Sequence, residues 1–215
     1  GDMQLFQSLS EIEKVLAKST TLQKNYKNVY TLDRMRALMA FLGNPQDKMR
    51  VVHVAGTSGK TSTSYYIARL LRSSGLKVGL TVSPHITDIR ERAQVNLDVL
   101  PEDEYCKYYS EYNEYIVNTK LNPTYFELLV AFSYWLFAKL SVDYAVVEVG
   151  LGGTLDGTNV VTRSDKVCVI TDIGYDHTQI LGTSLYQIAQ NKAGIIQPGT
   201  QVFTHNQSEE IMKAI

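Results

Sequence analysis

The chain has 215 residues, 44% of them hydrophobic and 20% charged, which is typical of a globular protein with one sizeable core. Its 21 basic and 22 acidic residues leave a net charge of −1, so no sequence-wide attraction favours nucleic acid or an anionic membrane surface. The two cysteines, Cys106 and Cys168, form no close-spaced pair for zinc or a disulfide framework, which fits a reducing cytoplasm and predicts that Cys168 fills the core.

Hydrophobic periodicity predicts the first elements of the chain. Ser8 with Glu11 resembles a capping box that opens a helix, and apolar residues recur at helical spacing over residues 32–42. Residues 50–55 form a short, apolar, β-branched run, and a glycine loop separates them from a helical pattern over residues 60–72. This order predicts a strand, a loop and a helix.

The rest of the chain alternates the same two patterns around a long polar stretch at residues 83–101. Further strands are predicted at residues 77–82, 143–149, 166–171 and 201–204, and further helices at 102–118, 124–140, 187–196 and 208–215. The apolar helix at 124–140 is too short to span a bilayer, and no segment resembles a secretory signal. Alternating strands and helices favour an α/β fold with a mostly parallel, doubly wound sheet.

The sharpest local pattern stands where the strand at residues 50–55 gives way to a helix, and it reads Gly56-Thr57-Ser58-Gly59-Lys60-Thr61. In such a loop, backbone N–H groups turn toward phosphate oxygens at the positive end of the helix. Lys60 would neutralise the β- and γ-phosphates of a nucleotide, and the Thr61 hydroxyl would ligate Mg²⁺. The general phosphate-loop signature has a glycine where Val54 stands, and the alternative is a glycine turn with a chance lysine.

Glu148 stands at the end of the otherwise apolar strand at residues 143–149. An ionised carboxylate there needs a partner, and beside a nucleotide phosphate that partner would be Mg²⁺. The alternative is a glutamate that caps a helix or forms a salt bridge.

Two downstream residues leave more than one interpretation open. His177 follows a buried strand at the edge where ligands of open sheets bind, and it fits either a ligand or a structural histidine. Lys192 shares a helical face with Ile188, so it either extends to water or places a positive charge near a metal-bound phosphate.

Taken together and in this order, the motifs resemble those of the folylpolyglutamate synthases and dihydrofolate synthases of the Mur ligase superfamily. The resemblance runs over nearly the whole chain and includes Leu42-Gly43-Asn44-Pro45-Gln46, His53-Val54-Ala55-Gly56-Thr57-Ser58-Gly59-Lys60-Thr61, Ser83-Pro84-His85, Thr124-Tyr125-Phe126-Glu127, Glu148-Val149-Gly150-Leu151-Gly152-Gly153, Asp176-His177-Thr178 and Lys192-Ala193-Gly194-Ile195. It implies a P-loop NTPase-like Mur ligase central domain over residues 1–215. The family's C-terminal Rossmann-like domain would be missing, so the chain alone is expected not to catalyse amide formation.

The resemblance also implies the residues of the site. ATP would be held by Gly56, Thr57, Ser58, Gly59, Lys60, Thr61 and Ser62. Mg²⁺ would be organised by Thr61, Ser83, Glu148, His177 and a carbamylated Lys192, and catalysis would depend on Lys60, Glu148, His177 and Lys192. The pterin or folate would lie against Asn28, Val29, Tyr30, Arg92, Thr124, Tyr125, Phe126, Glu127, Leu155, Asp156 and Gly157.

The reaction that the resemblance implies is ATP-dependent carbon–nitrogen ligation in a cytoplasmic monomer. The carboxylate of dihydropteroate or a reduced folate would attack the γ-phosphate of ATP, and the amine of L-glutamate would then attack the resulting acyl phosphate. Thr154 replaces an arginine common in the family, which bears on substrate preference more than on nucleotide binding. The alternatives are another Mur ligase, of the peptidoglycan or cyanophycin type, and a non-catalytic nucleotide-binding module.

Overall fold

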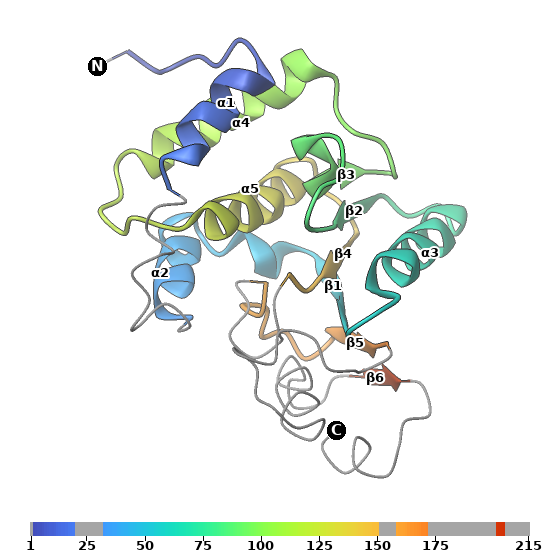
Figure 1. The fold of residues 1–215 in the computed structure, drawn as a ribbon. Helices are drawn as coiled ribbons and strands as arrows, with labels where there is room; N and C mark the ends of the chain where they lie inside the picture. Colours follow the sequence, from blue (N-terminus) through green and yellow to red (C-terminus); the bar gives the residue numbers. More distant parts are fainter. Residues whose placement is uncertain (1, 20–31, 151–157, 172–200, 205–215) are drawn as a thin grey trace.

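The computed structural model describes residues 2–19, 32–150, 158–171 and 201–204, and Figure 1 shows their arrangement. The helices are α1 (Leu9–Ala17), α2 (Asp33–Phe41), α3 (Lys60–Ser73), α4 (Glu102–Ile116) and α5 (Tyr125–Lys139), with the short 3-10 helices η2 (Pro45–Lys48) and η3 (Ile89–Arg92). The strands are β1 (Arg50–Ala55), β2 (Val78–Thr81), β3 (Gln94–Val95), β4 (Tyr144–Glu148), β5 (Val167–Ile170) and β6 (Gln201–Thr204). These bounds confirm the elements predicted within the described ranges, whereas the helices predicted at 187–196 and 208–215 lie outside them.

The strands form one sheet in the order β3-β2-β4-β1-β5-β6. All neighbouring strands are parallel except β3, which pairs antiparallel with β2. In Figure 1, α3 lies on one side of the sheet and α5 on the other. The predicted α/β fold with a mostly parallel, doubly wound sheet is therefore confirmed.

The two faces of the sheet belong to different cores because side chains alternate along a strand. Val52 and Val54 of β1 pack in one cluster with Ala68 of α3. Val51, one residue away, belongs to the larger cluster that includes Phe132 of α5. Burial on both faces explains why these strands appear in the sequence as continuous apolar runs.

The register of the parallel strands brings their carboxyl ends to one edge. Val54 of β1 pairs with Glu148 of β4, and Ala55 pairs with Ile170 of β5. On the other side of β4, Thr81 of β2 pairs with Val147. The residues that follow β1, β2, β4 and β5 therefore meet at a single sheet edge.

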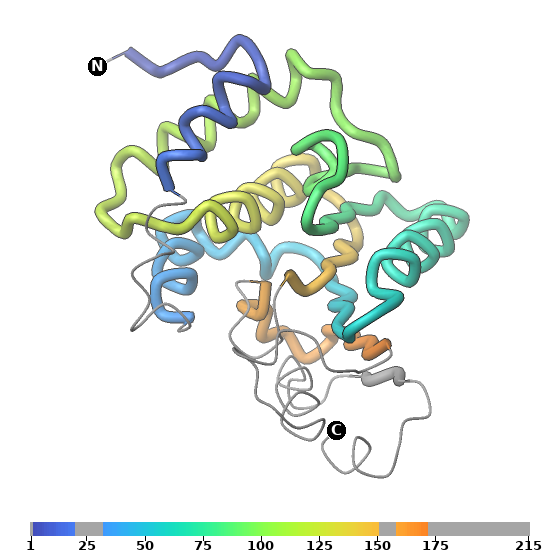
Figure 2. The backbone as a smooth tube through the Cα atoms, in the orientation of Figure 1, coloured from blue at the N-terminus to red at the C-terminus, as the bar shows by residue number. Residues whose placement is uncertain are grey.

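The layer outside the sheet is built on α5, against which α4, α1 and α2 pack (Figure 1). The residues before α1 run antiparallel to α4, as the tube in Figure 2 traces: Gln4 N–H donates to Glu114 Oε1 at 3.2 Å and Phe6 N–H to Ser110 Oγ at 2.9 Å. None of the helices in the described ranges is long and apolar enough to cross a membrane. Cys168 lies fully buried beside Ala55 and Val149, which confirms it as a core residue.

The predicted capping box at α1 is only half formed. Ser8 Oγ accepts the N–H of Glu11 at 3.3 Å, as a capping serine should. The Glu11 carboxylate, however, accepts the N–H of Gln7 at 2.8 Å rather than that of Ser8. The helix start was correct, but the reciprocal bond is shifted by one residue.

Candidate functional site

Between β1 and α3 the chain makes a glycine turn at the carboxyl edge of the sheet. Gly56 has φ 143° and Gly59 has φ 77°, both in the region that favours glycine. Gly59 is also the N-cap of α3, and since it has no side chain, it leaves the first N–H groups of the helix without a side-chain cap. This uncapped positive helix end, reached by a tight turn, is the geometry that binds phosphate.

Two consecutive residues of α3 reach across to the end of β4. Lys60 Nζ donates to the backbone oxygen of Val149 at 3.3 Å. Thr61 Oγ1 lies 3.0 and 3.1 Å from the two carboxylate oxygens of Glu148 and shares its proton between them. The structure thus joins three of the predicted site residues from segments nearly 90 positions apart in the chain.

Glu148 places a buried carboxylate at this edge. Only 3% of it is exposed, and burial raises the pKa of its carboxyl. The hydrogen bond from Thr61, the charge of Lys60 and a hydrogen bond from the Ser83 backbone each lower the pKa, but together they do not offset burial. The interactions within the chain therefore do not fully offset the cost of burying the ionised carboxylate. A cation placed at this edge would stabilise it.

Ser83 supplies a second oxygen at the same edge. It follows β2 by two residues, and its Oγ is buried without a hydrogen-bond partner among the residues that the structure describes. A buried hydroxyl normally has such a partner. Together with Thr61 and Glu148 it forms a set of oxygen donors, which is the ligand type that Mg²⁺ prefers.

The described segments contain no cluster of three or more His, Cys, Asp and Glu residues that could hold a metal ion. A cation here would accordingly depend on hydroxyl groups and a single protein carboxylate. Mg²⁺ suits such a site because it usually takes one or two carboxylates and fills its other positions with water and phosphate oxygens. The residues present fit this ion.

Thr171, which the sequence reasoning did not single out, also belongs to this edge. Its Oγ1 donates to the backbone oxygen of Ser58 at 2.7 Å, inside the glycine turn. A signal was available, because Thr171 directly follows the buried strand β5, at the same sheet edge as Glu148. The other predicted turn residues, Thr57 and Ser62, are half-buried and exposed respectively.

A second group of predicted residues gathers at the start of α5. Arg92 is buried, its Nε donates to His85 Nδ1 at 2.8 Å, and its guanidinium lies 5.5 Å from the ring centre of Tyr125. Because that bond requires an unprotonated Nδ1, and because burial and the charge of Arg92 lower the pKa of His85, the imidazole is neutral.

Thr124 and Glu127 have a structural task at the same place. They form a complete capping box, with Thr124 N–H donating to Glu127 Oε1 at 2.9 Å and Glu127 N–H to Thr124 Oγ1 at 3.2 Å. Arg34 Nε reaches the same carboxylate oxygen at 2.7 Å. The Thr-x-x-Glu spacing in the sequence is the signal for such a box.

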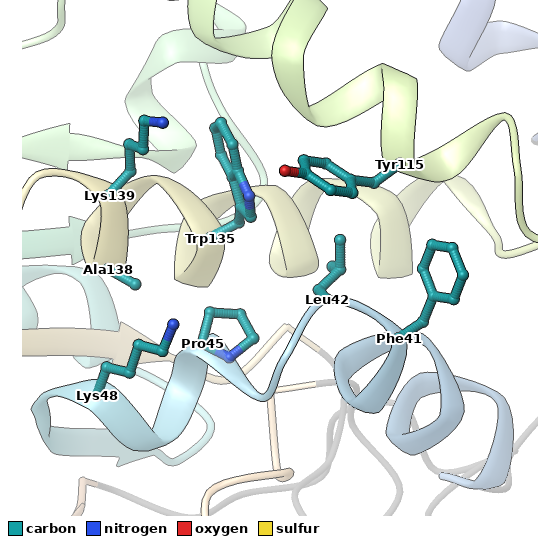
Figure 3. Close-up of a pocket in the computed structure, with 8 residues that line it drawn as sticks. All are labelled: Phe41, Leu42, Pro45, Lys48, Tyr115, Trp135, Ala138 and Lys139. Carbon is teal, nitrogen blue, oxygen red and sulfur yellow. The ribbon is translucent and has the colours of Figure 1, made fainter.

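The remaining predicted site residues lie outside the described residues: Asn28, Val29, Tyr30, Leu155, Asp156, Gly157, His177 and Lys192. A pocket of about 250 Å³, shown in Figure 3, lies away from the glycine turn. It opens between α2, η2, α4 and α5, and its lining consists of Phe41, Leu42, Pro45, Lys48, Tyr115, Trp135, Ala138 and Lys139. None of the predicted site residues contributes to it.

Comparison with known proteins matches residues 54–214 to the Mur ligase middle domain family. A folylpolyglutamate synthase of Arabidopsis thaliana is 41% identical over 172 residues, which is 78% of this chain and 30% of that protein. The dihydrofolate synthase/folylpolyglutamate synthase of Bacillus subtilis (strain 168) is 39% identical over 189 residues, 86% of this chain and 44% of the relative.

Among solved structures, an FPGS–AMPPCP–folate complex superposes with a TM-score of 0.83 at 33% identity, over 97% of this chain and half of that one. The chain spans less than half the length of the two curated relatives named above. The family match covers well over half of the chain and includes the glycine turn, Glu148 and Thr171. On this match and on the fold, the chain belongs to the Mur ligase family and carries its middle domain.

Proposed function

We propose that this chain is the ATP-binding domain of a folylpolyglutamate or dihydrofolate synthase, an ATP-dependent ligase that forms an amide with L-glutamate. The observation that carries the proposal is the buried Glu148 carboxylate, bonded to Thr61 beside Lys60 at the uncapped start of α3. The names of the relatives and the FPGS–AMPPCP–folate complex support this choice of substrates. Since the chain spans less than half of the curated relatives, the ligase activity is proposed for the protein that contains this domain.

Phosphate binding follows from the glycine turn. The N–H groups at the start of α3 would face the phosphate oxygens, and Lys60 would exchange its bond to the Val149 carbonyl for the β- and γ-phosphates. Such preformed donors lower the barrier to phosphoryl transfer by positioning and by neutralising charge that develops on the phosphate. No protein nucleophile is needed.

The oxygen donors at the sheet edge would hold the metal ion. Thr61, Ser83 and Glu148 are the ligands proposed from the described part of the chain, with His177 and a carbamylated Lys192 as further ligands. Mg²⁺ held there would supply positive charge that neutralises the phosphates. Within the chain, the Thr61 hydroxyl and the nearby charge of Lys60 favour the ionised carboxylate and offset part of the effect of burial.

The group around Arg92 is proposed to receive the pterin or folate. Arg92 lies against the Tyr125 ring, and Thr124 and Phe126 flank that ring in the sequence. An aromatic ring beside a guanidinium offers a flat apolar surface and a positive charge, which suits a planar heterocycle that carries a carboxylate. Asn28, Val29, Tyr30, Leu155, Asp156 and Gly157 complete the proposed surface, and Glu127 contributes by fixing the start of α5.

The test is ligand-dependent thermal stability of the purified chain. Mg²⁺ with ATP should raise the melting temperature of the wild type, and dihydropteroate or tetrahydrofolate should raise it further. At 100 times Kd, a ligand stabilises by about 2.7 kcal/mol. Lys60→Ala should abolish the ATP shift, whereas Lys48→Ala, an exposed lysine at the pocket in Figure 3, should keep it.

Three other outcomes would contradict the proposal in different ways. No shift with any ligand would mean that the glycine turn does not bind nucleotide. A shift with ATP and none with a pterin would favour a nucleotide-binding module. A shift with a UDP-sugar instead of a pterin would point to another type of Mur ligase.

A further inference from the structure

Thr171 stands directly after β5, where it extends the ladder between β5 and β1. Its backbone N–H donates to the Ala55 oxygen at 2.8 Å, and only 2% of the residue is exposed. The backbone of Thr171 thus completes the pairing of the two strands. Its hydroxyl is left for another task.

That hydroxyl donates a hydrogen bond to the Ser58 carbonyl in the glycine turn. Thr171 Oγ1 lies 2.7 Å from the Ser58 oxygen and 3.2 Å from the Ala55 oxygen. A threonine hydroxyl has one proton to donate, and the shorter contact has the typical O–H···O length. Because the Ala55 oxygen already accepts the Thr171 N–H, the bond that only the side chain can provide is the bond to Ser58.

The direction of the Ser58 carbonyl fixes the direction of the next N–H. In a planar trans peptide the C=O and N–H bonds point in opposite directions. With the Ser58 oxygen held toward Thr171, the N–H of Gly59 is turned away from that side chain, at the N-cap of α3. Gly59, with φ 77°, is the residue that can accept this peptide orientation without strain.

The same side chain also sets the path of the turn at its first glycine. A Cβ on Gly56 would collide with Thr171 Oγ1 and would lie 3.0 Å from Thr171 Cβ. The backbone at Gly56 therefore passes directly over Thr171. One side chain therefore contacts both the entry and the middle of the turn.

We infer that Thr171 is a positioning residue for the nucleotide triphosphate: its hydroxyl presets the 58–59 peptide so that the Gly59 N–H faces the phosphates before ATP arrives. This inference rests on the proposed ATP-binding function. A preset turn avoids the cost of reorienting a peptide on binding, so its loss should appear in affinity. Thr171 itself does not contact the nucleotide.

The experiment measures the Kd of AMPPCP in the presence of Mg²⁺, by calorimetry, for the wild type and for Thr171→Val, Thr171→Ala and Thr171→Ser. Val keeps the shape and loses the hydroxyl, Ala loses both, and Ser keeps only the hydroxyl. We expect Val and Ala to weaken binding about tenfold, the equivalent of one lost hydrogen bond, and Ser to restore it to within about threefold. Thr162→Val, at an exposed position, controls for the substitution itself.

The outcomes separate this inference from the proposed function. If the wild type does not bind AMPPCP, the proposed function fails and the variants are not needed. If the wild type binds and Val and Ala bind equally well, the hydroxyl does not position the turn. If Ser weakens binding as much as Val does, the methyl group matters rather than the hydroxyl, which also overturns the inference.

Discussion

The helical layer on α5 and the carboxyl edge of the sheet both contain buried polar atoms, yet these atoms have different partners. In the layer, Tyr112 Oη donates to the Leu128 oxygen at 2.8 Å and Ser110 Oγ to the Cys106 oxygen at 2.7 Å. At the edge, Ser83 Oγ finds no partner within the described ranges, and burial raises the pKa of Glu148. These hydroxyls of the layer bond to backbone oxygens inside it, whereas the edge leaves a hydroxyl and a buried carboxylate that a bound ion would satisfy.

The apolar part of the layer supports the same contrast. Phe132 is fully buried, and its ring centre lies 5.0 to 5.2 Å from those of Tyr109, Tyr112 and Tyr105. Aromatic pairs at such separations add stability beyond their buried area. The layer therefore contributes stability, whereas the edge holds a buried carboxylate that lowers stability and can bind a cation.

The largest effect is expected for Phe132→Ala, which would leave a cavity at the centre of the aromatic cluster. Such truncations cost about 3–5 kcal/mol, to be measured as the free energy of unfolding in urea. Phe41→Ala is the matched control, because 47% of Phe41 is exposed, and it should cost much less. The Kd of ATP for the folded variant should stay unchanged. A similar cost for both variants would show that the cluster is not the stabilising part.

Glu148→Gln should act in the opposite sense, with a gain in stability and a loss of Mg²⁺-dependent binding. Burial raises the pKa of Glu148 above its usual 4.5, so the folded state holds this proton more tightly than the unfolded state. The contribution of the group therefore falls as pH rises through the raised pKa, and it stays low at pH 7. Glutamine lacks the charge and avoids this loss.

The measurement is the melting temperature of both proteins from pH 4 to pH 8. The variant should melt higher at pH 7, and the difference should shrink as pH falls through the raised pKa of Glu148. Its Mg²⁺-dependent affinity for ATP should drop by about tenfold, the value of a charged hydrogen-bond acceptor. Glu104→Gln, at an exposed position of α4, should show neither effect. A lower melting temperature for Glu148→Gln at pH 7 would mean that the carboxylate stabilises the fold.

The sequence predicted the fold because its elements depend on local patterns. The strand at Arg50–Ala55 was placed correctly at both ends, since a short run rich in β-branched residues that stops at a glycine loop is typical of a buried strand. The helix predicted at 102–118 ends at Ile116, because helix ends depend on caps that periodicity does not show. The order of the strands in the sheet followed from no local signal.

The candidate site was predictable where one rule linked distant segments. Lys60, Thr61 and Glu148 meet because residues after parallel strands share an edge. The bond from Thr171 to Ser58 depends on the register of β5 against β1, which the sequence does not reveal. Likewise, no spacing rule predicts the hydrogen bond between Arg92 and His85, because it depends on the path that the chain takes between the two residues.

The smallest effect is a difference between two tyrosines of the helical layer, both fully buried on α4. Tyr112→Phe removes the bond to the Leu128 oxygen and should cost about 1 kcal/mol in the free energy of unfolding. Tyr105 Oη has no hydrogen-bond partner in the part of the chain that the structure describes, so Tyr105→Phe should be neutral or slightly stabilising.

Urea titration of the two single variants and the double variant measures this difference directly. Phenylalanine preserves the ring packing of each tyrosine with its aromatic neighbours, so only the hydroxyl is tested. If both variants lose the same stability, the Tyr105 hydroxyl has a partner and the two hydroxyls do not differ. If only Tyr112→Phe loses stability, Tyr105 is a buried polar group inside the layer itself, and the contrast with the sheet edge then depends on Glu148 and its charge rather than on unpaired hydroxyls.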